Sequence, residues 1–133
     1  MQPFTTPLTP AQARLKSPLA LAFLGDTVWD LLIRGSLLMS QAPAGVLHRR
    51  AVGLANAGAQ ADAFARVEPL LTPEEADVAR RGRNAHARHG PPRNQDPVDY
   101  SRATGLEALL GYLYLTGQEA RICELFDIGV PIK

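Results

Sequence analysis

Apolar positions along the chain follow helical spacing, and the segments that carry them begin with a capping side chain followed by proline. A proline in the first helical turn loses no hydrogen bond, and a Ser, Thr or Asp before it accepts one from an unpaired backbone N–H. Four such starts are Thr9-Pro10, Ser17-Pro18, Thr72-Pro73 and Asp96-Pro97. A fifth start near Pro43 precedes an alanine-rich stretch over 44–67. We therefore predict an all-α protein with five or six helices and no sheet.

Two of these helices, expected over 18–36 and 97–115, carry too many apolar residues to form one narrow stripe. We predict that they pack beside each other and share the core. Trp29, Leu32 and Leu37 of the first helix offer more apolar area than a thin domain hides, which suits a dimer face. Burial in the core of one protomer explains these three residues almost as well.

The composition limits the class of protein. The 133 residues, 46% of them hydrophobic, suffice for one core, so we predict a single domain over 1–133 with an irregular segment at 1–8. The 14 basic and 13 acidic residues give a formal net charge of +1, so any nucleic-acid site must come from local patterning. Cys123 is the single cysteine, which excludes an intramolecular disulfide. The sequence shows neither a signal peptide nor an apolar run of membrane-spanning length, and we expect a cytoplasmic protein without membrane contacts.

Three acidic residues lie within the two apolar helices. Asp26 lies in the middle of the first helix, where apolar neighbours are expected to bury it, and Asp30 follows one turn later. Glu107 has a similar setting in the second helix. If the helices cross, Asp26 and Glu107 can meet and bind Mg²⁺, which takes one or two carboxylates and keeps several waters. The alternative is that each acid pairs with an arginine such as Arg34 or caps a backbone group.

One long irregular segment is expected over 82–95, and segments of that length in compact domains tend to be functional. The chain from 80 to 95 contains no Asp or Glu and five arginines, which are Arg80, Arg81, Arg83, Arg88 and Arg93. We interpret it as a surface that contacts the phosphates of a nucleic acid. A solvated basic helix end, stabilised by the helix dipole, is the alternative.

Two motifs in the apolar helices resemble the ribonuclease III family. They are Ala22-Phe23-Leu24-Gly25-Asp26-Thr27-Val28 and Glu107-Ala108-Leu109-Leu110-Gly111. The likeness covers about 17–115 and is closest to the Mini-ribonuclease III branch, which consists of the catalytic domain without a double-stranded-RNA-binding domain. Further segments that support this branch are Leu47-His48-Arg49-Arg50, Ala59-Gln60-Ala61 and Arg81-Gly82-Arg83-Asn84-Ala85.

The resemblance implies the ribonuclease III catalytic fold, a homodimer, and cleavage of double-stranded RNA to 5′-phosphate and 3′-hydroxyl ends. It implies that Asp26 and Glu107 are catalytic residues that bind Mg²⁺, or Mn²⁺ as a substitute. Asp30 is a candidate outer ligand, and the alternative is an ordinary acid on the helix surface or in an interface. The substrate that it suggests is precursor large-subunit (23S) ribosomal RNA. The residues expected to contact RNA are Arg49, Arg50, Gln60, Arg80, Arg81, Arg83, Asn84, Arg88 and Arg93.

The chain departs from the pattern of full-length ribonuclease III enzymes, which carry acids where this sequence has Leu19, Ala22 and Thr104. The smaller acidic set leaves two alternatives. One is a non-catalytic RNA-binding or ribosome-associated protein on the same fold. The other is a helical metal-dependent hydrolase of nucleotides.

Overall fold

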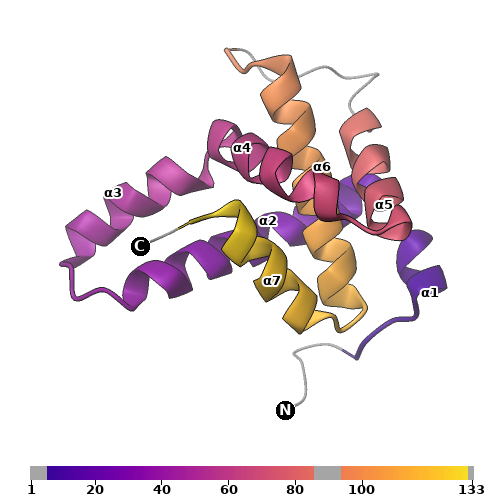
Figure 1. Cartoon of the computed structure of the whole chain (residues 1–133), viewed down its shortest axis with the longest axis horizontal. Helices are drawn as coiled ribbons and strands as arrows, with labels where there is room; N and C mark the ends of the chain where they lie inside the picture. The colour runs from indigo at the N-terminus through magenta and orange to yellow at the C-terminus, as the bar shows by residue number, and fades with distance from the viewer. Residues whose placement is uncertain (1–5, 86–93, 132–133) are drawn as a thin grey trace.

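The computed structural model describes residues 6–85 and 94–131, and every element within these ranges is helical, as the sequence predicts. In chain order the elements are α1 (Pro10–Arg14), α2 (Pro18–Leu38), α3 (Ala44–Ala55), α4 (Ala57–Val67), the short 3-10 helix η1 (Glu68–Leu70), α5 (Pro73–Asn84), α6 (Pro97–Leu115) and α7 (Glu119–Gly129). Figure 1 shows α2 and α6 crossing near the centre, while α3 extends to one side. In the described ranges no helix has both the length and the apolar character needed to span a membrane.

Four helices begin at the prolines that follow capping residues in the sequence. Ser17 Oγ accepts a hydrogen bond from the backbone N–H of Ala20 at 3.1 Å, and Asp96 caps α6 in a similar way. Thr9 and Thr72 form complete capping boxes at the starts of α1 and α5. The four predicted starts are therefore confirmed, and α6 has its predicted bounds.

The alanine-rich stretch over 44–67 is divided into two helices rather than continuing as one. At the division, Asn56 Oδ1 accepts a hydrogen bond from the backbone N–H of Ala59 at 2.9 Å, and Asn56 Nδ2 donates to the carbonyl oxygen of Gly53 at 3.1 Å. An asparagine that bonds the backbone on both sides competes with the hydrogen bonds of a continuous helix. For this reason α3 ends and α4 begins at Asn56.

Two other segments differ from the prediction. Because α5 continues through Asn84, residues 82–84 are helical and not irregular, and 86–93 lie outside the described residues. The sequence pattern does not predict α7, because the first turn of this helix carries no clear capping signal. Its N-cap, Gln118, makes no side-chain capping hydrogen bond, and no proline follows it.

The helices α2 and α6 approach so closely that their backbones touch. A Cβ atom at Gly25 would overlap the carbonyl oxygen of Glu107, and a Cβ atom at Gly111 would overlap the carbonyl oxygen of Leu21. Only glycine permits this approach, because it alone has no Cβ. The contact brings Asp26, the neighbour of Gly25, close to Glu107.

Trp29 belongs to the core of a single protomer. Its side chain is 2% exposed, its ring meets Phe126 edge-on with the centroids 5.7 Å apart, and its Nε1 donates to the carbonyl oxygen of Leu54 at 3.0 Å. Leu37 is buried in the same core, and Leu32 packs against it. Core burial, and not a dimer face, therefore accounts for Trp29, Leu32 and Leu37.

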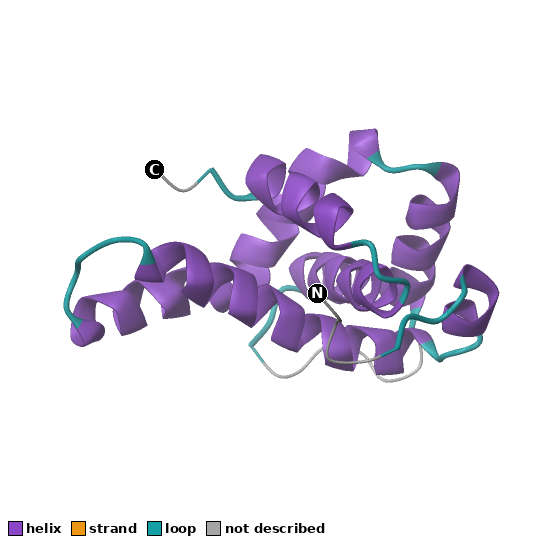
Figure 2. Cartoon of the chain, turned by 90° about the horizontal axis from the view of Figure 1, so that it is seen from below, coloured by secondary structure: helices purple, strands orange, loops and turns teal. Residues whose placement is uncertain are grey.

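The C-terminal half of α2 and the returning α3 form an arm that extends from the body of the molecule (Figures 1 and 2). One face of α2 exposes large apolar side chains that recur at helical intervals. We call this set the α2 apolar stripe, and its members are Leu19, Phe23, Leu31 and Leu38. None of these residues is among the three that the sequence suggested for a dimer face.

Candidate active site

Asp26 of α2 and Glu107 of α6 lie beside each other where the two helices cross. Their carboxyl groups are close enough to share a hydrogen bond, and the negative charge of Asp26 acts on Glu107. Glu107 is partly buried, whereas Asp26 is exposed to solvent. The structure thus brings together the two acids that the family motifs single out, although they are far apart in the sequence.

The sequence predicts a buried Asp26, and this prediction is wrong. The buried positions of α2 include Leu21, Val28 and Trp29, which face the core, while Asp26 lies at the edge of the contact with α6, where solvent reaches it. Glu107 lies deeper, between Asp26 and Gln60 of α4. The pair therefore has one carboxyl group that solvent reaches and one that the protein largely encloses.

The setting of Glu107 opposes its ionisation. Burial, followed by the hydrogen bond and the negative charge of Asp26, raises the pKa of Glu107 to about 8, and a hydrogen bond from Gln60 opposes this rise. Without a cation, Glu107 therefore keeps its proton at neutral pH. A positive ion shared by the two carboxyl groups would remove their repulsion and favour the ionised form.

Gln60 is the third polar residue beside the acidic pair. Its side chain is 4% exposed, and its Nε2 donates to Oε2 of Glu107 at 3.4 Å. The sequence assigned Gln60 to the RNA contacts, but the structure places its amide against Glu107 and not on an open surface. The resemblance suggested Gln60 only as a neighbour of the site, because the contact of its amide with Glu107 depends on how the fold brings α4 to α6.

Asp30 has an arginine partner of its own. Arg34 Nε lies 3.1 Å from Asp30 Oδ2, one helical turn away on α2, and both side chains are substantially exposed. This is the alternative that the sequence left open for the acids. Among the ion pairs of the described residues, none involves Asp26 or Glu107. Asp30 as an outer metal ligand therefore stays a prediction.

The acidic pair fits a hydrated divalent cation. The residues that the structure describes contain no cluster of three or more His, Cys, Asp or Glu side chains that could hold an ion. Mg²⁺ is commonly held by one or two carboxylates and retains several waters, so a larger protein cluster is unnecessary. Asp26 and Glu107 supply hard oxygen ligands. When both are ionised, a bound cation neutralises their negative charges and removes the repulsion between them.

Three arginines of the predicted RNA surface are bonded to other parts of the protein. Their partners are Asp77 for Arg80 at 2.5 Å, the carbonyl oxygen of Arg14 for Arg81 at 3.3 Å, and Glu68 for Arg83 at 3.3 Å. Exposed ion pairs contribute less than about 1 kcal/mol, so an approaching phosphate can compete for Arg80 and Arg83, whereas Arg81 donates to a backbone carbonyl in a partly buried setting. Arg88 and Arg93 lie outside the described residues.

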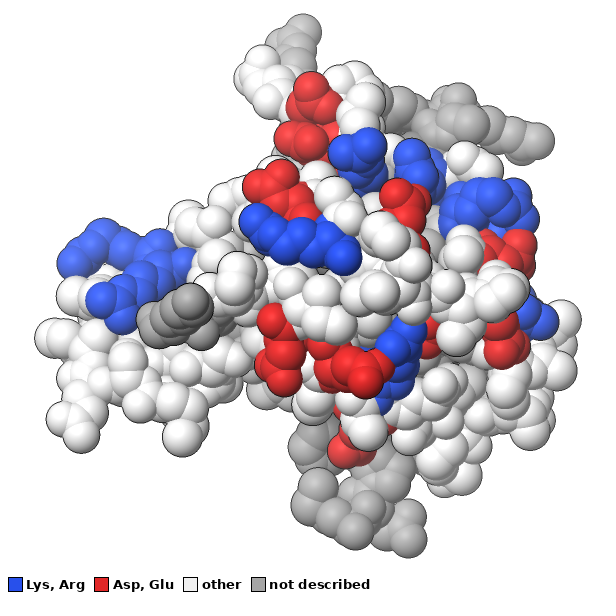
Figure 3. Space-filling model, in the orientation of Figure 1, with Lys and Arg blue, Asp and Glu red and all other residues white. Residues whose placement is uncertain are grey.

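The remaining predicted RNA contacts lie at two separate places. Arg49 and Arg50 are exposed on α3, and Asn84 is exposed at the end of α5. Figure 3 shows one group of basic side chains over α3 and others on the opposite side of the same face, with acidic side chains between them. On this face the basic residues therefore do not form one continuous patch.

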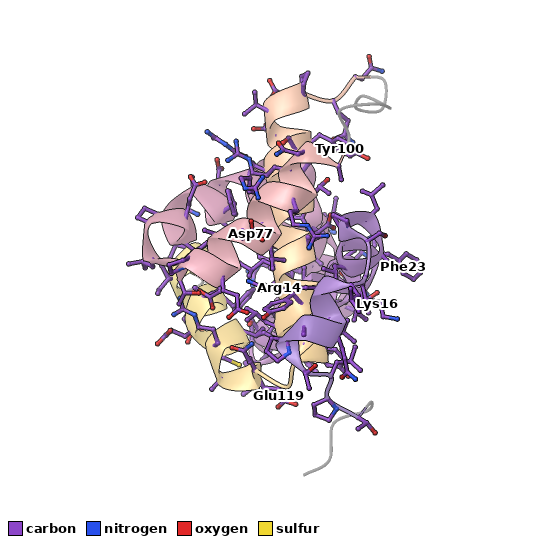
Figure 4. The ribbon with its side chains drawn as sticks, turned by 90° about the vertical axis from the view of Figure 1, so that its right-hand side faces the viewer. Arg14, Lys16, Phe23, Asp77, Tyr100 and Glu119 are labelled. Carbon is purple, nitrogen blue, oxygen red and sulfur yellow. The ribbon has the colours of Figure 1, made fainter. Side chains whose placement is uncertain are left out.

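Phe23 is a surface residue that the sequence pattern assigns to a buried helix. Its side chain is 83% exposed and projects outward from α2 (Figure 4). Its position four residues after Leu19 and eight before Leu31 is the sequence signal that could have placed it in an exposed stripe.

Comparisons with known proteins identify the family of this chain. A family model described as Ribonuclease III domain matches residues 19–118, a range that contains Asp26, Gln60 and Glu107. A Mini-ribonuclease 3 from Symbiobacterium thermophilum is 46% identical over 111 residues, which cover 83% of this chain and 85% of the relative. A Mini-ribonuclease 3 from Gloeobacter violaceus is 45% identical over 112 residues, which cover 84% of this chain and 82% of that relative.

The fold also has a counterpart among solved structures. The X-ray crystal structure of a protein from Fusobacterium nucleatum matches with a TM-score of 0.78 at 31% sequence identity, over 86% of this chain and 92% of that chain. The match extends over most of both molecules, so it concerns the whole fold and not a single helical hairpin. The chain therefore belongs to the ribonuclease III family of endoribonucleases, and within it to the Mini-ribonuclease 3 proteins.

Proposed function

We propose that this protein is a divalent-metal-dependent endoribonuclease that cleaves double-stranded RNA. The observation that carries the proposal is the Asp26–Glu107 pair, in which the crossing of α2 and α6 brings two carboxyl groups together, one exposed and one largely enclosed. With both carboxyl groups ionised, such a pair is unfavourable unless a cation binds there. A protein that only binds RNA has no need of it, so the pair favours the enzyme over the non-catalytic alternative.

The residues of the pair have distinct tasks in the proposed reaction. A divalent cation held there would make a bound water more acidic and stabilise negative charge on the phosphate oxygens. Glu107 would hold the cation in its ionised form, because a carboxylate must be ionised to bind metal. Asp26 is exposed, so it lies on the side from which a phosphodiester can approach. The resemblance to the ribonuclease III family implies that hydrolysis leaves 5′-phosphate and 3′-hydroxyl ends.

Arginines on α3 and α5 support the binding of an RNA duplex. Proteins recognise A-form RNA mainly through its shape, its phosphates and its 2′-hydroxyl groups. Arg49 and Arg50 are exposed and suited to phosphate contacts, and Arg80 and Arg83 are held by surface ion pairs that a phosphate can replace. Arg81, beside them on α5, is proposed as a further contact. Recognition of this kind depends little on base sequence.

The α2 apolar stripe supports a homodimer. Large apolar side chains exposed along one face of a helix commonly mark an interaction site, and Phe23 alone exposes most of a large aromatic ring. The stripe lies on the same helix as Asp26, so a two-fold pairing through α2 would set two acidic pairs at a fixed separation. Each protomer would then cut one strand of the duplex.

The resemblance to Mini-ribonuclease III supports one substrate in particular. We propose that the enzyme acts in the cytoplasm on a duplex stem in precursor 23S ribosomal RNA. Transcripts that carry the stems of this precursor, compared with unrelated duplexes of equal length, test this part of the proposal. Equal cleavage rates for all duplexes would argue against a ribosomal substrate while leaving the enzyme activity intact.

The central test uses purified protein and long double-stranded RNA. We expect cleavage in the presence of Mg²⁺ or Mn²⁺ and loss of cleavage when a chelator is added. Binding of the duplex without cleavage at any divalent ion concentration would favour the non-catalytic alternative. Release of product from free nucleotides, with duplex RNA left intact, would favour a nucleotide hydrolase.

A further inference from the structure

Gln60 lies beside the acidic pair, where its amide meets the carboxyl group that the protein encloses. Its side chain is 4% exposed, and the bond from its Nε2 to Oε2 of Glu107 joins α4 to α6. We infer that Gln60 is a positioning residue, whose amide holds the carboxylate of Glu107 in the orientation that binds the divalent cation. This inference rests on the proposed function.

The local structure of α4 places Gln60 with little freedom. Asn56 caps the helix through its side chain, and the backbone N–H of Gln60 donates to the carbonyl oxygen of Asn56 at 3.1 Å. Gln60 therefore lies in the first turn of α4, directly after the sharp division from α3. Ala61, Ala63 and Phe64 anchor the same helix in the core. The helix axis is thus fixed on both sides of the amide.

The chemistry of an amide suits this place better than that of a charged group. An ionised carboxylate only accepts hydrogen bonds, so the amide must present its N–H group to Glu107. The bond occupies Oε2 and leaves the other carboxylate oxygen available for a cation. Because the amide is neutral, it orients Glu107 without cancelling the negative charge that attracts the cation. A lysine or arginine at this position would compete with the metal.

The inference separates Gln60 from the arginines of the RNA surface. A side chain that is 4% exposed and bonded to Glu107 offers a duplex little to contact. Loss of its amide should therefore weaken cation binding and slow the chemical step, with no effect on RNA affinity. Residues that form hydrogen bonds with a metal ligand commonly contribute roughly 10–100-fold to metal affinity or activity.

The experiment compares Gln60→Met and Gln60→Leu with the wild-type protein. Both substitutions have similar size and favour helix, but neither can donate a hydrogen bond. Three quantities are measured. They are kcat and KM on duplex RNA, and the Mn²⁺ dissociation constant without RNA, which is followed by the electron paramagnetic resonance signal of free Mn²⁺. Asp62→Asn, an exposed change two residues further along α4, is the matched control.

We expect kcat to fall and the Mn²⁺ dissociation constant to rise, each by roughly 10–100-fold, with KM unchanged. Unaltered Mn²⁺ affinity and kcat would overturn the inference, as would a higher KM with kcat retained, which is the sign of an RNA contact. Failure of both variants to fold would also overturn it, because the amide would then be a requirement of the fold. If the wild-type protein binds Mn²⁺ but leaves duplex RNA intact, the proposed function fails, while the Mn²⁺ titration still decides the role of Gln60.

Discussion

At the scale of single residues, the acidic pair combines two unlike carboxyl groups. Asp26 is open to solvent, and Glu107 is enclosed between Asp26 and Gln60. Such a difference in surroundings separates the proton affinities of two chemically similar groups. The exposed group can meet a substrate or a solvent ligand, and the enclosed group gives the cation a fixed anchor.

The first prediction concerns the roles of the two acids. Asp26→Asn and Glu107→Gln keep the size of each side chain but remove its charge, so cleavage of duplex RNA should fall by more than roughly 100-fold. Circular dichroism should show unchanged helix content. Asp127→Asn, an exposed change on α7, serves as the control and should cleave normally. Activity retained in either pair variant would remove that residue from the proposed site.

The second prediction follows from the proton on Glu107. Without metal, the carboxyl group loses its proton near pH 4.5 in the unfolded chain and near pH 8 in the folded protein. Between these values the folded state binds more protons than the unfolded state, so the free energy of unfolding falls as the pH rises, by at most about 1.4 kcal/mol per pH unit. This stabilisation is complete below the lower pKa and lost as the pH passes the upper one.

Urea unfolding in the presence of a chelator, repeated across this pH window, measures the effect. Glu107→Gln has no proton to lose and should show a smaller fall in stability than the wild-type protein. Equal pH dependence in the two proteins would mean that Glu107 ionises normally. In the wild-type protein, added Mg²⁺ should reduce the fall, because it favours the ionised carboxylate.

At the scale of helices, the site depends on how closely α2 and α6 approach. The absence of a side chain at Gly25 and Gly111 lets the two backbones touch, and the acids flank that contact. The division at Asn56 has a similar consequence for α4, because it sets where the first turn begins and hence where Gln60 lies. The positions of the three polar side chains are therefore set by helix packing.

The third prediction tests this packing. Gly25→Ala or Gly111→Ala should force the helices apart and lower the free energy of unfolding by roughly 1–3 kcal/mol, with loss of cleavage. Gly53→Ala on α3 is the control, since a Cβ there meets nothing within 4 Å. It should leave stability unchanged or raise it by up to about 1 kcal/mol, as alanine favours helix over glycine. Denaturant unfolding of the three variants measures the difference, and equal effects would contradict close packing at the crossing.

At the scale of the whole molecule, the exposed apolar surface and the exposed basic residues lie in different places. The α2 apolar stripe follows one face of the longest helix, while exposed arginines lie on the arm formed by α2 and α3 and near the end of α5 (Figures 1 and 3). A dimer through the stripe would cover its apolar surface and add a second acidic pair. Arginines of both protomers would then bind the same RNA duplex.

The fourth prediction concerns this dimer. Phe23→Glu should raise the dimer dissociation constant by roughly 100-fold or more, because two buried phenylalanines contribute several kcal/mol. Light scattering coupled to size-exclusion chromatography measures the change. Leu70→Glu, a comparable change at a half-exposed leucine outside the stripe, should leave the dimer intact. A wild-type protein that is monomeric and fully active would contradict the role proposed for the stripe.

The fifth prediction concerns the arginines of α3. Replacement of Arg49 and Arg50 by glutamine should weaken the binding of all duplexes similarly and reduce the salt dependence of binding by about one or two units of slope. Binding is measured over a series of salt concentrations with the metal omitted, so that cleavage does not interfere. An unchanged slope would place the phosphate contacts on other residues.

The sequence by itself determined the features that depend on neighbouring residues. Capping side chains followed by proline specified four helix starts, since the hydrogen bonds involved join residues only a few positions apart. The Asn56 division and α7 escaped prediction. A lone asparagine within an alanine-rich stretch, or a first turn without a capping side chain, gives a weak local signal.

Only the tertiary structure decided what lies inside and what lies outside. Asp26 and Phe23 are exposed although they lie in an apolar helix, while Trp29 is buried within one protomer and leaves the apolar stripe to other residues. The contact of Gln60 with Glu107 depends on α4 meeting α6. Hydrophobic pattern specifies that a helix has a buried face, but which face meets which neighbour depends on packing between helices distant in the chain.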